Sequence, residues 1–214
     1  MSLPDVVSRE QWLEARRRLL AREKEFTRSH DALNADRRRL PMVKVDKEYV
    51  FEGPDGPVTL AQLFGDKRQL IVQHVMFGPD WDKPCPGCSA AIDELSPGVL
   101  EHVASRDTAF VLASRAPYDK LATAAAERGQ AEYNYRAEPS LLGGDRSAEM
   151  PGYSCFLREG DEIFHTYSAF ARGTEYVGNA YTYLDMTALG RQEDWEEPKG
   201  RVAPVRGGDP TFTS

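Results

Sequence analysis

Two cysteines, Cys85 and Cys88, stand two residues apart in the segment CPGC and are the residues best suited to chemistry. A thiolate is a nucleophile, and a second thiol at this spacing can attack the mixed disulfide that the first one forms. The apolar run 70–78 predicts a buried strand before the pair, and helix-like spacing follows from Ser89. Both sulfurs are therefore expected at a helix N-terminus, which stabilises a thiolate. We expect Cys85 to attack and Cys88 to resolve.

The same cysteines could instead hold a metal ion. A structural zinc site needs further cysteine or histidine ligands at short spacing, and the four histidines are scattered along the chain. Copper is the better alternative, because soft thiolates suit Cu(I) and His74 could be a third ligand beside Cys85 and Cys88. A lone histidine in an apolar strand is more often a hydrogen-bonded core residue. We therefore prefer an interpretation with no metal and no cofactor.

Strand and helix patterns alternate around the cysteines and predict an α/β protein. Residues 42–66 indicate a hairpin with a Pro-Asp-Gly turn, running into a helical turn. The remaining predicted elements are strands at 70–78 and 108–116, a helix at 117–129, a loop or insertion at 131–150, a hairpin turning at Glu159-Gly160, and a helix near 174–184. Pro97 and Gly98 should divide the helix that follows the cysteines.

The ends of the chain differ from its middle. Residues 1–41 predict a helical extension, with a capping box at Ser8 and Gln11. A seven-residue spacing puts one narrow apolar stripe on this charged helix, formed by Trp12, Leu19, Phe26, Leu33 and Leu40. We expect the stripe to pack on its own domain, and a homodimer seam is the alternative. Residues 42–191 form the main domain, and 192–214 are expected to be an extended or disordered tail.

Composition excludes several classes of partner. The 214 residues carry a net charge of -7, which gives no electrostatic reason to bind nucleic acid or an anionic membrane. No basic N-terminal region precedes an apolar stretch, and no apolar run approaches the ~18 residues of a membrane span. We therefore expect a cytoplasmic protein. In that reducing compartment three cysteines do not make a structural disulfide framework.

The order of elements, with C-x-x-C opening a helix and Met150-Pro151 before a final hairpin, resembles the thioredoxin-like superfamily. The segments MFGPDWDKPCPGCS, FVLASRAPYDKL, FHTYSAFARG and YTYLDMTALGRQED are similar to the bacterial domain-of-unknown-function 899 family, whose members are predicted dithiol-disulfide oxidoreductases. The resemblance implies a thioredoxin-like fold, in which helices flank a central mixed sheet, preceded here by the N-terminal helical extension.

The resemblance also implies roles for single residues. Cys85 and Cys88 match the redox pair, and Pro151 matches the proline, cis in thioredoxins, that packs beside the pair and leaves a backbone edge open to substrate. Further candidates for substrate contact are Trp81, His165 and Tyr167, with Tyr181 and Tyr183 near them. Period-2 spacing would put His165 and Tyr167 on one face of the last strand, although such residues are more often packing residues.

The motif departs from the family patterns in two ways. Thioredoxins have tryptophan directly before the first cysteine and Gly-Pro between the pair, whereas Trp81 lies four residues upstream and the order here is Pro-Gly. A peroxiredoxin would have threonine where Asp82 stands, which argues against peroxidase chemistry. Cys155 is expected to be a small buried apolar residue, with a third redox role as the alternative.

These observations together predict a thiol-disulfide oxidoreductase. Its substrate would be a disulfide-containing protein or a small-molecule thiol compound, and a cellular reductant would restore the dithiol. An insertion at 134–149 could cover the site. The alternatives are a copper-binding or other metal-binding protein of the same fold, and a redox-inert interaction module that works through the N-terminal stripe.

Overall fold

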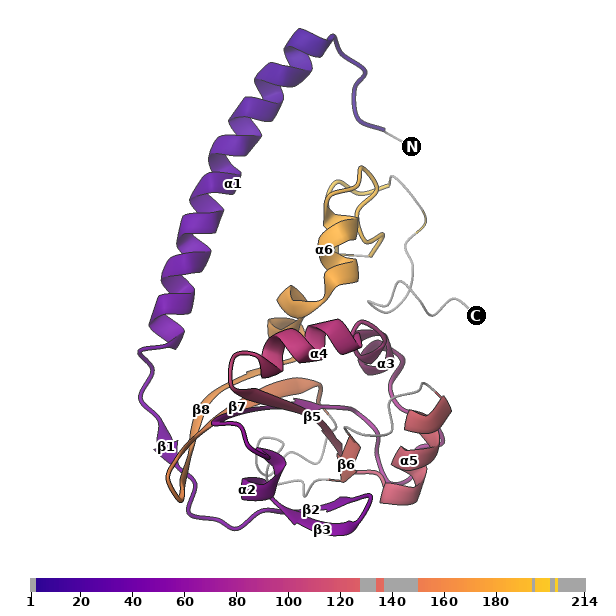
Figure 1. Cartoon of the computed structure of the whole chain (residues 1–214). Helices are drawn as coiled ribbons and strands as arrows, with labels where there is room; N and C mark the ends of the chain where they lie inside the picture. The colour runs from indigo at the N-terminus through magenta and orange to yellow at the C-terminus, as the bar shows by residue number, and fades with distance from the viewer. Residues whose placement is uncertain (1–2, 128–133, 137–149, 194, 201–202, 204–214) are drawn as a thin grey trace.

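The structure, a computed structural model, describes residues 3–127, 134–136, 150–193, 195–200 and 203, and in these ranges the strands form one eight-stranded sheet (Figure 1). Across the sheet the order is β1-β8-β7-β4-β5-β6-β2-β3. The strands are β1 (Val43–Lys44), β2 (Val50–Gly53), β3 (Gly56–Thr59), β4 (Gln69–His74), β5 (Thr108–Ser114), β6 (Asn134–Arg136), β7 (Gly152–Glu159) and β8 (Glu162–Phe170). The helices are α1 (Arg9–Arg37), α2 (Leu60–Leu63), α3 (Pro86–Asp93), α4 (Pro97–Ala104), α5 (Tyr118–Glu127), the 3₁₀ helix η3 (Ala171–Val177) and α6 (Asn179–Asp185).

Four adjacent strands, β5-β4-β7-β8, form the centre of the sheet. β4 and β5 are parallel, so their connection must cross over the sheet, and α3 and α4 make that crossover. β7 runs antiparallel to both β4 and β8. The cysteines open α3, which follows β4, and Pro151 directly precedes β7. This arrangement confirms the mixed sheet and the thioredoxin-like fold that the sequence resemblance implied.

The core lies on both faces of this sheet, because side chains alternate along each strand. One face packs the aromatic and aliphatic side chains of α2 and the β2–β3 hairpin against Leu70 and Val72 of β4. The other face packs α3 against Leu112 of β5 and Val75, just beyond β4. In Figure 1 α3 and α4 lie above the central strands of the sheet, and α2 lies below them, next to the β2–β3 edge.

Element boundaries differ from the predictions where the chain leaves the sheet. β4 ends at His74 rather than at residue 78. The N–H of Val75 makes the last hydrogen bond to β5, and the chain then turns toward α3. Pro97 does divide the helix, because α4 begins there with Ser96 as its N-cap. β6 lies inside the segment expected to be a loop. The rest of that segment up to Glu149, including the 137–149 part of the insertion, falls outside the described residues.

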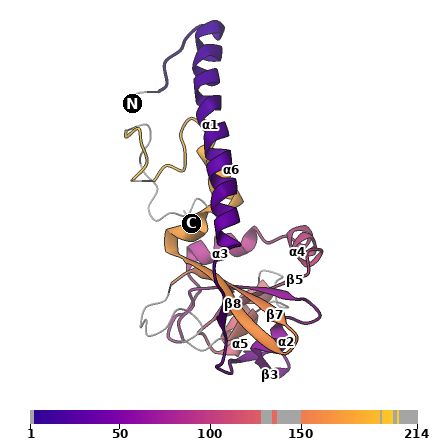
Figure 2. The same ribbon diagram turned by 90° about the vertical axis from the view of Figure 1, so that its left-hand side faces the viewer.

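The long helix α1 leaves the sheet at β1 and projects away from the domain (Figures 1 and 2). Its capping box at Ser8 and Gln11 is confirmed. All 29 of its residues are described and none is buried. The expectation that the apolar stripe packs on its own domain is therefore wrong. The last turn of α1 contacts the domain through Arg37, whose guanidinium lies 5.3 Å from the ring of Tyr167 and 5.1 Å from that of Tyr176. No helix of the described ranges is long and apolar enough to cross a membrane.

The C-terminal region is more folded than expected. η3 and α6 replace the single helix predicted near 174–184. The first part of the expected tail folds back, because the Arg172 guanidinium lies 4.1 Å from the Trp195 ring and the Glu196 carboxylate accepts the N–H groups of Arg191 and Glu193. Aromatic and charged side chains therefore give this segment partners that its composition did not indicate.

Leu70→Ala tests the core directly, because Leu70 is 0 % exposed at the centre of the sheet. We expect a loss of about 2–5 kcal/mol in unfolding free energy, from lost apolar burial and the cavity left behind. Urea denaturation measures the loss as a lower midpoint. The matched control is Leu3→Ala, the same truncation at an exposed position, which should change the midpoint little. Equal midpoints for the two variants would contradict this placement of the core.

Candidate active site

Cys85 and Cys88 lie at the N-terminus of α3, as the sequence predicts. Cys85 is the N-cap residue and is partly exposed, whereas Cys88 lies in the first turn and is buried. Pro86 takes the first helical position, where a missing N–H costs nothing. All three cysteines of the chain are described, and none is in a disulfide. The two thiols thus differ in access to solvent, which is what a division into attacking and resolving cysteine requires.

The peptide groups of Met76 hold both cysteines. The N–H of Cys85 donates to the Met76 carbonyl at 2.8 Å, and the N–H of Met76 donates to Cys88 Sγ at 3.3 Å. A backbone N–H directed at sulfur stabilises negative charge on it. Met76 directly follows Val75, whose N–H makes the last hydrogen bond to β5. The two cysteines are therefore bonded to the chain just beyond the end of β4.

Apolar side chains surround the inner cysteine. Cys88 packs with Val75, Ile92 and Leu112, and each of these is at least nine-tenths buried. This packing excludes water from the inner thiol while leaving Cys85 at the surface. A substrate sulfur can therefore reach Cys85 more readily than Cys88.

Tyr153 and Glu94 belong to this site, although the sequence reasoning did not select them. Burial raises the pKa of Tyr153 to about 12, with smaller contributions from Cys88, Glu94 and Tyr176, so its phenol stays protonated. The carboxylate of Glu94, at the end of α3, accepts the backbone N–H groups of Asn179 and Ala180 and so joins α3 to α6. Period-2 counting from Pro151 would have placed Tyr153 on the α3 face.

Pro151 lies at the end of the sheet where β4 gives way to the cysteine segment. It directly precedes Gly152, which pairs with His74, and its carbonyl accepts the N–H of Ala171 at 2.9 Å. The peptide bond before Pro151 is trans, because the cis bond of the described residues is Glu197-Pro198. In this respect Pro151 differs from the thioredoxin pattern that the resemblance implied.

A β-bulge in β8 overturns the expected pairing of His165 with Tyr167. Tyr167 lies opposite Cys155, but His165 lies opposite Phe156, so one extra residue separates the two pairs. Directly paired residues share a face, and the extra residue therefore sends Tyr167 and His165 to opposite faces of the sheet. The rings confirm this, with Phe156 and His165 centroids 5.4 Å apart. Tyr167 remains on the α3 face, opposite Cys155, and the Arg37 guanidinium lies over its ring.

His74 lies on the face opposite the cysteines. Along β4 it alternates with Val75, which packs on Cys88, and its ring lies 5.6 Å from that of Phe170. The structure therefore does not bring His74 together with Cys85 and Cys88. In the part of the chain described, no group of three or more histidine, cysteine or acidic side chains could hold a metal ion.

His74 is also an unusual core residue. It is 1 % exposed, and neither ring nitrogen has a hydrogen-bond partner in the described part of the chain, contrary to the expected bonded histidine. Burial, and then the nearby His165, lower its pKa to about 4. The ring is therefore neutral in the folded protein near neutral pH.

The remaining candidate residues lie at the edge of the cysteine site or outside it. Trp81 is exposed in the loop between β4 and α3, where its ring packs over Gly78 and Lys120 donates to its carbonyl at 3.3 Å. Cys155 is half-buried beside Tyr167, and burial raises its pKa, as expected of an inert thiol. Tyr183 is exposed on α6, away from the sheet.

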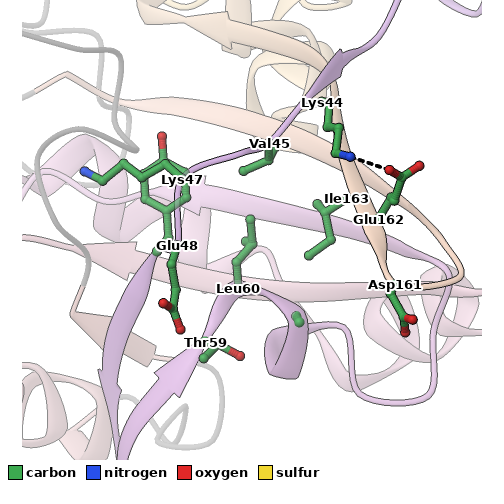
Figure 3. Close-up of a pocket in the computed structure, with 11 residues that line it drawn as sticks. Lys44, Val45, Lys47, Glu48, Thr59, Leu60, Asp161, Glu162 and Ile163 are labelled. Atoms are coloured by element: carbon green, nitrogen blue, oxygen red, sulfur yellow. Dashed lines mark hydrogen bonds and ion pairs between the residues drawn. The ribbon is translucent and has the colours of Figure 1, made fainter.

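A separate hollow lies on the face opposite the dithiol. It has a volume of about 320 Å³, and Leu60 and Ile163, which line it, belong to or pack on the core cluster of that face (Figure 3). An ion pair between Lys44 and Glu162 crosses its rim. The hollow is therefore no part of the cysteine site.

A dithiol at a helix N-terminus, next to the β5-β4-β7-β8 arrangement, defines a thioredoxin-like protein. The chain matches, over residues 1–205, a family described as "Bacterial protein of unknown function (DUF899)", and it belongs to that family. No curated protein matches the sequence significantly.

Solved structures resemble the chain at a distance. Peroxiredoxin Q of Xanthomonas campestris is 13% identical, with a TM-score of 0.43, over 70% of this chain and 96% of that one. A putative thioredoxin from Neisseria meningitidis is 14% identical, with a TM-score of 0.38, over 73% and 93%. A hypothetical protein from Sinorhizobium meliloti is 16% identical, with a TM-score of 0.44, over 68% and 81%. Similarity this distant says nothing about the reaction of this chain.

The low pKa of His74 predicts acid sensitivity. His74 has a pKa of 6.5 in the unfolded chain and about 4 in the folded protein. The free energy of unfolding is therefore undiminished by this group above about pH 6.5 and falls as the pH drops toward 4. The loss should approach about 3 kcal/mol by pH 4. Urea denaturation between pH 7 and pH 4.5 should show a smaller decline for His74→Leu than for the natural protein. The exposed control His102→Leu should keep the full decline, and an equal decline in both variants would remove His74 as the cause.

Proposed function

We propose that this protein is a dithiol-disulfide oxidoreductase in which Cys85 attacks and Cys88 resolves. The observation that carries the proposal is the unequal placement of the two thiols on one helix end. Cys85 is partly exposed at the N-cap, where the helix dipole favours a thiolate, and Cys88 is buried one turn later.

The reaction proceeds in two exchanges. The Cys85 thiolate attacks one sulfur of a substrate disulfide, forms a mixed disulfide and releases the other sulfur as a thiolate, which takes up a proton. Cys88 loses its proton and attacks Cys85 Sγ, forming the Cys85–Cys88 disulfide and releasing the second substrate thiolate. Two electrons pass from the protein dithiol to the substrate. A cellular thiol reductant then returns two electrons and two protons to the cysteine pair.

The surroundings of Cys88 suit its role as the second nucleophile. Its sulfur is held by the Met76 N–H, which steadies the charge that develops there when the proton leaves. The protonated phenol of Tyr153 is a second polar group near this sulfur. Apolar packing keeps external disulfides from Cys88, so its partner is the neighbouring Cys85.

The substrate class follows from the accessibility of Cys85. A partly exposed sulfur beside the exposed Trp81 loop can meet a disulfide of another protein or of a small molecule. Reduction in this direction suits a cytoplasmic setting, where a thiol pool keeps such a pair reduced. Among the candidates for substrate contact, Tyr167 lies on the same face of the sheet as the cysteines, and Pro151 lies at the same end. His165 lies on the opposite face.

The mechanism predicts different results for the two cysteines. Cys85→Ser should abolish disulfide reduction, because no nucleophile remains at the surface. Cys88→Ser should stop the reaction at the mixed disulfide and capture the substrate on Cys85, visible by non-reducing electrophoresis and mass spectrometry.

Cys155→Ser is the matched control, since it makes the same change at a half-buried thiol outside the motif. It should keep near-natural turnover and capture nothing. Full turnover in Cys85→Ser would sink the mechanism, and lost turnover in Cys155→Ser would mean that a third thiol takes part.

A further inference from the structure

Two apolar surfaces of the chain are left uncovered. The first is the stripe of α1, where the exposed fraction reaches 50 % at Trp12 and 71 % at Phe26. The second belongs to η3, α6 and the residues after them, where it reaches 66 % at Tyr183 and 72 % at Met186. Further members of the two surfaces are Leu19, Leu20 and Leu33 on the first, and Tyr176, Val177 and Leu189 on the second. Exposed apolar side chains in such numbers are typical of surfaces that contact another protein.

The helix α1 has exposed apolar side chains along most of its length and packs none of them in the core. Its 29 residues extend about 43 Å, and a helix in water gains most of its stability from packing an apolar face. Among the residues that the structure describes, α1 contacts the domain through Arg37 in its last turn. The rest of the stripe contributes nothing to the core of its own domain.

The two segments that bear these surfaces carry opposite net charge. Residues 9–39 contain ten basic and six acidic side chains, whereas residues 171–200 contain three basic and six acidic ones. Opposite net charges favour contact between the two segments and disfavour contact of either with its own copy. Moreover, the position four residues after each of Trp12, Leu19 and Phe26 is charged or polar, so two α1 helices lack the second apolar position of a coiled coil.

Both surfaces also rise from the same side of the sheet. In Figures 1 and 2, α6 stands beside α1 above α3 and α4. A second copy related by a two-fold axis can therefore meet both surfaces together, and each contact then occurs twice.

From these observations we infer that two copies of this chain form a homodimer by exchange, in which α1 of each copy packs on the η3–α6 surface of the other. The exchange buries both apolar surfaces and pairs the basic helix with the acidic C-terminal segment. Because Glu94 joins α6 to α3, the partner's helix seats on a segment bonded directly to the dithiol helix.

The test uses the full chain with one charge placed on either surface, Phe26→Glu or Met186→Glu. Light scattering during size-exclusion chromatography should give twice the 24.0 kDa chain mass for the natural protein and a single chain mass for each variant. Val99→Glu, at an exposed apolar position of α4, is the control and should remain dimeric. Circular dichroism checks folding, and Leu33→Glu with Tyr183→Glu repeats the test if either first variant misfolds.

Mixing the two variants distinguishes exchange from other dimers. A mixed pair keeps one intact contact, between the natural α1 of the Met186→Glu chain and the natural α6 of the Phe26→Glu chain, so an equimolar mixture should regain dimer. A monomeric natural protein overturns the inference. A dimer that resists Met186→Glu, or a mixture that stays monomeric, overturns the exchange.

Discussion

The peptide groups on either side of Met76 are the constraint on which the site depends. One accepts the N–H of Cys85 and the other donates to Cys88 Sγ, so both cysteines are bonded to the residue at which the chain leaves β4. The dithiol helix cannot shift along the sheet without losing both bonds. The same anchoring explains why β4 ends early, since the backbone of Met76 bonds to the α3 segment instead of a neighbouring strand.

The sheet separates two sets of chemically capable residues. The cysteines, Tyr153 and Tyr167 lie on the α3 side, while His74 and His165 lie on the other. Burial leaves both sides with neutral groups, a protonated phenol on one and an unprotonated imidazole on the other. This separation favours thiol exchange over metal binding, because the histidine that could complete a copper site cannot reach the sulfurs through the sheet.

The periphery is linked to the site by a few polar contacts. Glu94 binds the first turn of α6, and Arg37 of α1 stacks on Tyr167 and Tyr176 above β8. These contacts hold the bases of two uncovered helices close to the cysteine face. The proposed dimer surface and the proposed substrate surface thus lie on one side of the molecule.

The sequence by itself determined the order of elements, the cysteine pair at a helix start and the break at Pro97, because these depend on local periodicity and on the backbone limits of proline. Only the tertiary structure decided which side chains meet. One extra residue in β8 sends two side chains to opposite faces of the sheet, which period-2 counting cannot detect. That the apolar side chains of α1 are left exposed by the domain is likewise visible only in the structure. Even the bonds of Met76 join residues nine and twelve positions apart, so no local pattern encodes them.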